Sequence, residues 1–334
     1  MRFRIRRWHI PILVLLALAA VAAILYAIPS GEYLYVPDRA IRADPLVTVP
    51  DDKNAGGPGG IYMVDVRVRS ASLLERLIPG LNSGASLVPA ERVNPLGVSD
   101  AERQQSGKQD MQRSQQLAAV VALRSLGYHV GAEPNGVTVN QVDPDAPGAA
   151  HFEIGDRIVR IAGRPIRTTT DLRDAMGSVT SGDTVDVTVQ RQGGLEQLHV
   201  PTESAAGPGG GKRPVFGILV VQNADVHLPI DISIDARNIG GPSAGLAFAL
   251  DIIDELGPDI DRGRRIVATG EIGIDGTVGP IGGIKQKTIG ARESDADLFL
   301  VPKANAADAR RYADGLRIVP VSNFKQALAA VEAR

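Results

Sequence analysis

The stretch GGPSAG at residues 240–245, followed by TGEIGIDGTVGPIGGIKQK at residues 269–287, decides the fold class of this chain. The glycines of the first stretch allow a sharp turn and a close approach of the backbone to a ligand. Pro242 suits a first helical turn, and the apolar spacing over residues 242–256 predicts a helix. Ser243 would then lie at a helix N-terminus, where free N–H groups can face a developing oxyanion.

The five-residue pattern around this serine also fits other chemistry. Gly241-x-Ser243-x-Gly245 matches the nucleophile elbow of α/β-hydrolases, which need a histidine after the serine. All five histidines precede Ser243, so this interpretation is excluded. A trypsin-like order with His227 as base stays open, although the Gly-Asp-Ser-Gly context of those enzymes is absent. The sequence has no His-Glu-x-x-His metal motif, and a serine that only caps a helix is the structural alternative.

A lysine is the remaining side chain that could activate the serine. In a helix over residues 284–292, Lys287 lies about 60° from the buried Ile284, and Lys285 lies about 100° away on the other flank. A lysine base must be neutral, and burial lowers its pKa from about 10.4. We therefore expect Lys287 to be the base and Lys285 to be a solvated surface charge. The lysines that follow the serine are Lys285, Lys287, Lys303 and Lys325.

Together, the two stretches resemble the proteolytic domain of Lon proteases, and we place this domain at residues 214–334. The resemblance implies an α/β domain with a serine–lysine dyad. In this dyad Ser243 is the nucleophile and Lys287 is the general base. The chain departs from the family at Gly240, because many Lon enzymes have Asp three residues before the serine.

The same resemblance assigns supporting roles around the dyad. It implies that the hydroxyl of Thr269 hydrogen-bonds the lysine amine. It also implies that Gly241, Pro242 and Ala244 support the nucleophile or the oxyanion. An ordinary strand threonine is the alternative for Thr269.

A different pattern precedes this region. Ile154-Gly155-Asp156-Arg157-Ile158, followed by Ala162-Gly163, resembles the signature of bacterial PDZ domains, and we place this domain at residues 116–202. The resemblance implies that an extended peptide adds as a strand to an exposed sheet edge. Leu126-Gly127-Tyr128-His129 matches the family's carboxylate-binding loop only weakly. The alternating residues predict strands at 137–139 and 185–189, with a helix at 170–176.

The N-terminus has the pattern of a membrane anchor. Four arginines precede an uncharged run at residues 10–28, which at about 1.5 Å per residue is nearly long enough to cross a hydrocarbon core of about 30 Å. We expect residues 1–29 to hold a cytoplasmic tip and a transmembrane helix. The protein would then be a single-pass protein of the cell membrane with its bulk outside the cytoplasm. A cleaved signal peptide is the alternative.

Two further segments complete the expected order. Residues 30–115 form an extracytoplasmic N-terminal region with a strand predicted at 62–68, and the residues do not reveal its role. Residues 203–213 form a Gly/Pro linker, because Ala206 and Arg213 replace the Gly and the Ser/Thr that a phosphate loop needs. The sequence therefore gives no sign of an ATPase module.

The composition limits the possible functions. A chain of 334 residues suits two or three modules. A net charge of -2 argues against a nucleic-acid partner, and the absence of cysteine removes disulfides and thiolate sites. We expect an α/β and α+β protein with a transmembrane helix, a small barrel-like PDZ domain with helices and a Lon-type domain, without a cofactor or a metal.

The whole order resembles the PDZ-containing, ATP-independent branch of Lon-like peptidases in bacterial envelopes. This implies a serine endopeptidase that cleaves unfolded or membrane-associated polypeptides, with the PDZ domain binding the substrate. A homo-oligomer is expected by analogy, because Lon-type domains commonly form rings. The alternative is a PDZ-led scaffold or adaptor with a peptidase fold that does not cleave.

Overall fold

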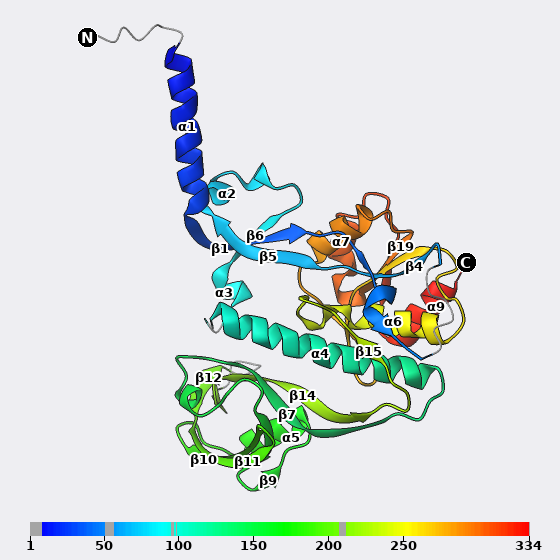
Figure 1. Ribbon diagram of the computed structural model, residues 1–334. Helices are drawn as coiled ribbons and strands as arrows, with labels where there is room; N and C mark the ends of the chain where they lie inside the picture. Colours follow the sequence, from blue (N-terminus) through cyan, green and yellow to red (C-terminus); the bar gives the residue numbers. More distant parts are fainter. Residues whose placement is uncertain (1–8, 51–56, 95–96, 98, 207–211, 334) are drawn as a thin grey trace, which may run out of the picture.

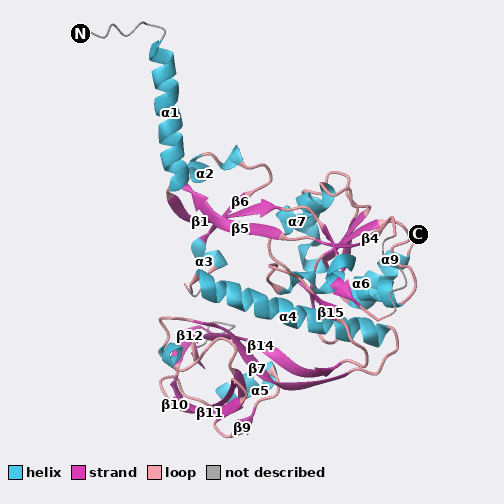
Figure 2. Cartoon of the chain, viewed as in Figure 1, coloured by secondary structure: helices cyan, strands magenta, loops and turns pink. Residues whose placement is uncertain are grey.

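The computed structural model describes residues 9–50, 57–94, 97, 99–206 and 212–333. Figure 1 shows two bodies of structure with the long helix α4 (Asp100–Ser125) between them. One contains both helices and strands, and we call it the α/β body. The other is built mainly from strands between residues 131 and 227, as Figure 2 shows, and we call it the β body.

A five-stranded sheet in the order β2-β4-β16-β19-β20 is the framework of the α/β body. The last four strands in this order run parallel, and β2 pairs with β4 antiparallel. Parallel strands need crossover connections that cover both faces of a sheet, so their residues are apolar throughout. The strands are β2 (Ile41–Arg42), β4 (Gly60–Met63), β16 (Arg265–Ala268), β19 (Leu298–Pro302) and β20 (Ile318–Val321).

Side chains of this sheet alternate between two apolar cores on its opposite faces. Ile266 and Ala268 of β16 join the core that contains helix α6, whereas Val267 between them joins the core that contains helix α7. The mixed α/β fold that the sequence predicts is therefore confirmed. One face carries α4, α6 (Gly245–Leu256) and α9 (Phe324–Glu332), and the other carries α7 (Ile284–Arg292) and α8 (Ala306–Arg310).

The N-terminal region is built into the α/β body. The predicted strand at 62–68 is divided in two, because β4 ends at Met63 and β5 begins at Val66. Strand β4 enters the central sheet, whereas β5 pairs with β1 in a separate antiparallel sheet of the order β5-β1-β6. The elements are α1 (His9–Ala27), β1 (Pro29–Pro37), β3 (Val47–Thr48), β5 (Val66–Ser72), α2 (Leu73–Leu77), β6 (Ser86–Pro89) and α3 (Ala90–Val93).

The β body is a sheet in the order β11-β10-β8-β7-β14, with β9 paired to β8. Val139, Ile158 and Val187 are fully buried in its core, and the rings of Phe152 and Phe216 lie 5.6 Å apart. Strand β14 pairs with β7 although it follows the predicted linker in sequence. The elements are β7 (Gly131–Val142), β8 (Arg157–Ile161), β9 (Arg164–Pro165), α5 (Thr169–Met176), β10 (Thr184–Arg191), β11 (Gly194–Pro201), β12 (Glu203–Ala206), β13 (Lys212–Val215) and β14 (Ile218–His227).

The predicted membrane anchor is contradicted. Within the described residues, no helix has the length and apolar character needed to cross a membrane. The transmembrane helix at residues 1–29 and the single-pass location at the cell membrane were therefore wrong predictions. The arginine-rich tip lies outside the described residues.

Helix α7 packs so closely on the end of β1 that one position requires glycine. A Cβ atom at Gly290 would overlap the carbonyl oxygen of Asp38. We expect Gly290→Ala to lower the free energy of unfolding by about 1–3 kcal/mol in urea titrations, because the helix must move away from the strand. The matched control is Gly282→Ala, where a Cβ atom meets nothing within 4 Å. Equal stability of the two variants would contradict this packing.

Candidate active site

Ser243 lies in a tight turn that leads into helix α6. Gly241 has a φ of 88°, which glycine adopts without strain. The short 3-10 turn η4 (Pro242–Ala244) then continues directly into the helix. Two donors fix the carbonyl of Ser243: the N–H of Gly270 at 2.9 Å and the hydroxyl of Thr269 at 3.1 Å. The turn is therefore held against the end of β16.

Lys287 reaches this serine from the opposite face of the sheet. It lies on α7, which begins after Gly283 in the left-handed conformation with a φ of 68°. Its Nζ atom is 2.9 Å from Oγ of Ser243 and 2.6 Å from the carbonyl oxygen of Val64. Only 3% of the side chain is exposed. The two residues that the sequence predicts as nucleophile and base are thus in hydrogen-bond contact.

Burial changes the protonation of this lysine. Loss of hydration lowers the pKa of Lys287 to about 8, and the nearby carboxylate of Asp65 partly opposes the change. In turn, burial raises the pKa of Asp65, and the positive charge of Lys287 opposes that increase. A lysine with a pKa near 8 is neutral in a useful fraction of molecules at neutral pH, as a general base requires.

The N-terminal region supplies two groups of the site that sequence reasoning missed. Val64 and Asp65 form the short break between β4 and β5, which places them beside the amine of Lys287. The signal in the sequence was slight. The consecutive apolar residues Tyr62, Met63 and Val64 interrupt the alternation that predicted one strand over 62–68.

The supporting residues have partners different from those the resemblance implies. The hydroxyl of Thr269 donates to the carbonyl of Ser243 instead of contacting the lysine amine. The N–H of Gly241 donates to the carbonyl of Gly107 on α4, so it serves to hold the turn. Pro242 has no N–H group. Ala244 lies in the first helical turn, where N–H groups lack partners within the helix and can face an oxyanion.

The other candidate bases lie apart from the serine. Lys285 donates to the carbonyl of Ala85 and to the hydroxyl of Ser86 at the start of β6, and it is half-buried. The prediction of a solvated surface charge was therefore wrong for Lys285. His227 is exposed at the end of β14, opposite Gly131, so the trypsin-like alternative receives no support.

Three carboxylates at the far end of α6 could hold a metal ion by distance alone. The oxygens of Asp254, Asp259 and Asp261 lie within 4.8 Å of one another. Each of these side chains already accepts backbone N–H groups of the loop that follows the helix. Burial raises the pKa of Asp254 to about 6. The group therefore has a structural role in this loop without any ion.

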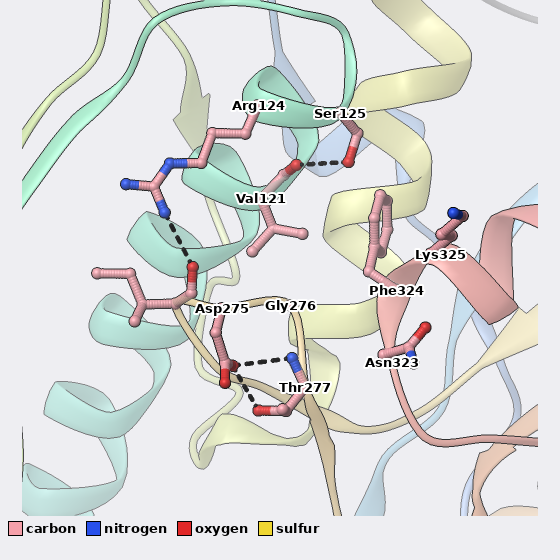
Figure 3. Close-up of a pocket in the computed structure, with 10 residues that line it drawn as sticks. Val121, Arg124, Ser125, Asp275, Gly276, Thr277, Asn323, Phe324 and Lys325 are labelled. Atoms are coloured by element: carbon pink, nitrogen blue, oxygen red, sulfur yellow. Dashed lines mark hydrogen bonds between the residues drawn. The ribbon is translucent and has the colours of Figure 1, made fainter.

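A cavity of about 510 Å³ lies between α4, the loop before β18 (Val278–Gly279) and the start of α9. Figure 3 shows that its polar side chains are bonded locally: Arg124 to the carbonyl of Ile274, and Thr277 to Asp275. Neither Ser243 nor Lys287 lines it. This cavity is therefore separate from the serine–lysine site.

The buried lysine and the serine at a helix start lie in hydrogen-bond contact, which is the arrangement that a serine hydrolase with a lysine base would need. Residues 216–332 match the family of the Lon protease C-terminal proteolytic domain, and residues 120–202 match the PDZ domain family. The chain therefore contains a PDZ domain and a Lon-type proteolytic domain. These matches support its assignment to the serine peptidases, which are hydrolases.

Individual proteins and solved structures are similar to parts of this chain. Lon protease 1 of Myxococcus xanthus is 37% identical over 112 residues, which are 32% of this chain and 13% of that protein. The Lon protease of Azorhizobium caulinodans is 34% identical over 143 residues, which are 41% of this chain and 16% of that protein. The PDZ domain of an SdrC-like protein from Listeria monocytogenes is 30% identical, with a TM-score of 0.24, over 26% of this chain and 88% of that one. The chain thus spans less than a fifth of the curated proteases.

Asp65 should tune the pH at which the site works. We expect Asp65→Asn to lower the pKa of Lys287 further, because it removes the negative charge that favours the protonated amine. Activity that needs neutral lysine rises through a pKa near 8 in the parent chain, so this limb should move to lower pH in the variant. The measurement is kcat/KM against pH with a short peptide. A limb that stays in place or moves to higher pH would contradict the assignment.

Proposed function

We propose that this chain is a serine endopeptidase that works without ATP, with Ser243 as nucleophile and Lys287 as general base. The observation that supports it is the 2.9 Å contact between Nζ of Lys287 and Oγ of Ser243, with the lysine buried and its pKa lowered to about 8. A surface lysine would remain charged and could not accept a proton. The scaffold alternative has no need of such a contact.

The proposed reaction follows from the positions of these groups. Neutral Lys287 accepts the hydroxyl proton while Oγ of Ser243 attacks the scissile carbonyl carbon. Free N–H groups of the first helical turn, including that of Ala244, stabilise the oxyanion. The tetrahedral intermediate collapses, the C–N bond breaks, and Lys287 returns its proton to the leaving amine. Water then attacks the acyl-enzyme by the same proton path and releases the acid.

The preferred substrates follow from the absence of an unfoldase motif in the sequence. No Walker A motif is present, since Ala206 and Arg213 occupy two of its required positions. These 334 residues contain no motif for unfolding work, so the site on its own accepts chains that are already unfolded or that open locally. We therefore propose unfolded polypeptides as the substrate class.

The PDZ domain offers a place for such a chain. Strand β14 lies in the part of the chain that matches the Lon-type domain, but it pairs with β7 of the PDZ sheet, and among the described strands its other edge has no partner. A groove of about 470 Å³ lies between β14 and α5, lined largely by apolar side chains with Arg173 and Arg213 among them. An extended peptide can add to β14 there through main-chain hydrogen bonds, and the two arginines favour acidic groups or a terminal carboxylate. Residues 126–129, the weak loop candidate, end helix α4 and do not line this groove.

The dyad is tested with two neighbouring lysines of one helix. We expect Ser243→Ala and Lys287→Ala each to reduce ATP-free hydrolysis of an unfolded protein by at least about a thousandfold. Lys285→Ala is the matched control and should keep activity within about tenfold, because its amine faces β6. Circular dichroism and thermal unfolding show whether each variant is folded.

The outcomes of this experiment separate the two proposed functions. Activity retained by folded Lys287→Ala would remove the lysine from its role as base. A folded parent chain that cleaves no unfolded protein or short peptide would favour the scaffold. Loss of activity in Lys285→Ala but not in Lys287→Ala would assign the base to Lys285, on the other flank of α7. This result would contradict the proposed dyad.

The groove is tested by separating long from short substrates. Met176 at the end of α5 lines the groove, and Met176→Glu puts a charge among its apolar residues. We expect KM for an unfolded protein to rise about tenfold, which corresponds to about 1.4 kcal/mol of binding. Cleavage of a peptide too short to reach the groove should not change. Met176→Leu is the matched control, and equal effects on both substrates would contradict substrate capture in the groove.

A further inference from the structure

Helix α4 contacts both the catalytic turn and the PDZ domain. Figure 1 shows it lying between the two bodies. Its C-terminal half is packed in the core of the α/β body, where Ala118 and Ala122 are fully buried beside residues of α6. Its N-terminal half carries a series of polar contacts that neither packing nor the proposed chemistry accounts for.

On one side, α4 holds the backbone of the catalytic turn. The carbonyl of Gly107 accepts the N–H of Gly241 at 2.8 Å, and the hydroxyl of Ser114 donates to the carbonyl of Pro242 at 2.9 Å. Ser114 is buried, with 2% of its surface exposed. The two bonded groups of the turn, at Gly241 and Pro242, directly precede the nucleophile Ser243.

The close approach of the turn to Gly107 explains the glycine at position 240. A Cβ atom at Gly240 would lie 3.3 to 3.5 Å from backbone atoms of Gly107, which is tighter than most side-chain contacts. At Gly107 itself a Cβ atom would lie 3.7 Å from backbone atoms of Gly240 and Gly241, which is ordinary contact, so the helix contributes its backbone carbonyl rather than a required absence of a side chain.

On the other side, α4 is joined to β7 of the PDZ domain. The hydroxyl of Ser106 donates to Oδ1 of Asn140 at 2.9 Å, and Nδ2 of Asn140 donates to Asp110 at 3.3 Å. Ser106 and Asn140 are both buried. Buried polar groups that lose their partners are costly, so this contact fixes the helix at the residue next to Gly107.

The surroundings of this contact are loosely filled. A cavity of about 690 Å³ lies between Glu102 and Gln105 of α4 and the PDZ residues Phe152 and Ile154. The N-terminal half of the helix therefore meets the PDZ domain beside open space rather than in a continuous apolar core. The hydrogen bonds of Asn140 are therefore important for holding the helix in place there.

We propose that Gly107 and Ser114 of helix α4 are positioning residues for the nucleophile turn, and that Asn140 of the PDZ domain holds α4 in place for this task. This inference rests on the proposed serine peptidase function. Ser243 must lie within hydrogen-bond reach of Lys287 and of the substrate carbonyl, and a displacement of about 1 Å can cost about a hundredfold in rate. The PDZ domain is then part of the support of the active site as well as a place to bind substrate.

The experiment compares Ser114→Ala and Asn140→Ala with controls that make the same chemical change. Ser125→Ala removes a hydroxyl on the same helix that bonds to the helix carbonyl of Val121. Asn135→Ala changes an asparagine on β7, the strand that also carries Asn140. The side-chain amide of Asn135 has no hydrogen-bond partner among the described residues. Hydrogen exchange of the Gly241 amide reports the turn directly and needs no activity. Cleavage of a peptide too short to reach the PDZ groove reports catalysis.

We expect the Gly241 amide to exchange about tenfold faster in Ser114→Ala and Asn140→Ala, with exchange in α6 unchanged. We also expect kcat for the short peptide to fall about tenfold while KM stays within about twofold, because placement of the nucleophile changes and substrate binding does not. The controls should match the parent chain in both measurements.

Three results would overturn the inference. Gly241 exchange that is unchanged in folded Ser114→Ala and Asn140→Ala would show that the contacts do not hold the turn. Faster exchange with kcat unchanged would show that the turn needs no such support. Equal effects in Ser125→Ala and Asn135→Ala would show that the contacts contribute only to general stability. A parent chain without activity would contradict the proposed peptidase function, while the exchange measurement would still decide whether α4 holds the turn.

Discussion

The burial of one amine is the constraint on which the rest of the structure depends. Moving a charged ammonium out of water costs several kcal/mol, so the protein accommodates Lys287 by lowering its pKa to about 8. Its Nζ atom donates to the carbonyl of Val64 and to Oγ of Ser243. The same burial that lowers the pKa therefore also directs the amine at the serine.

No single segment of the chain can enclose that amine. Val64 lies 223 residues before Lys287, and the two meet because β4 and β16 are parallel neighbours in the central sheet. Ser243 arrives from the face that carries α6, and Lys287 arrives from the face that carries α7. The pair meets at the carboxyl ends of β4 and β16, so displacing β4 would expose the lysine and return its pKa toward the value in water.

Sequence reasoning could find the parts of this site that have local signatures. The glycines around Ser243 and the spacing of Ile284 and Lys287 mark a turn and a helix face, and both depend on residues close together in the chain. Asp65 and Gly107 act only through contacts with distant segments, so periodicity could not reveal them. A clear local pattern can also mislead. The apolar run at residues 10–28 predicted a spanning helix that the described structure does not contain.

The position of the PDZ domain in the chain follows from the same sheet. In sequence it lies between β4 and β16. The free-energy cost of closing a loop grows only with the logarithm of the loop length. A whole domain can therefore be inserted between two strands if the two ends of the domain lie close together. They do, because Gly131 at the start of β7 pairs with His227 at the end of β14. The segment that leaves β14 leads directly to the turn of Ser243. The PDZ sheet therefore fixes the start of this segment, and α4 fixes its end. For this reason the positions of the PDZ sheet and of α4 both affect the residues before the nucleophile.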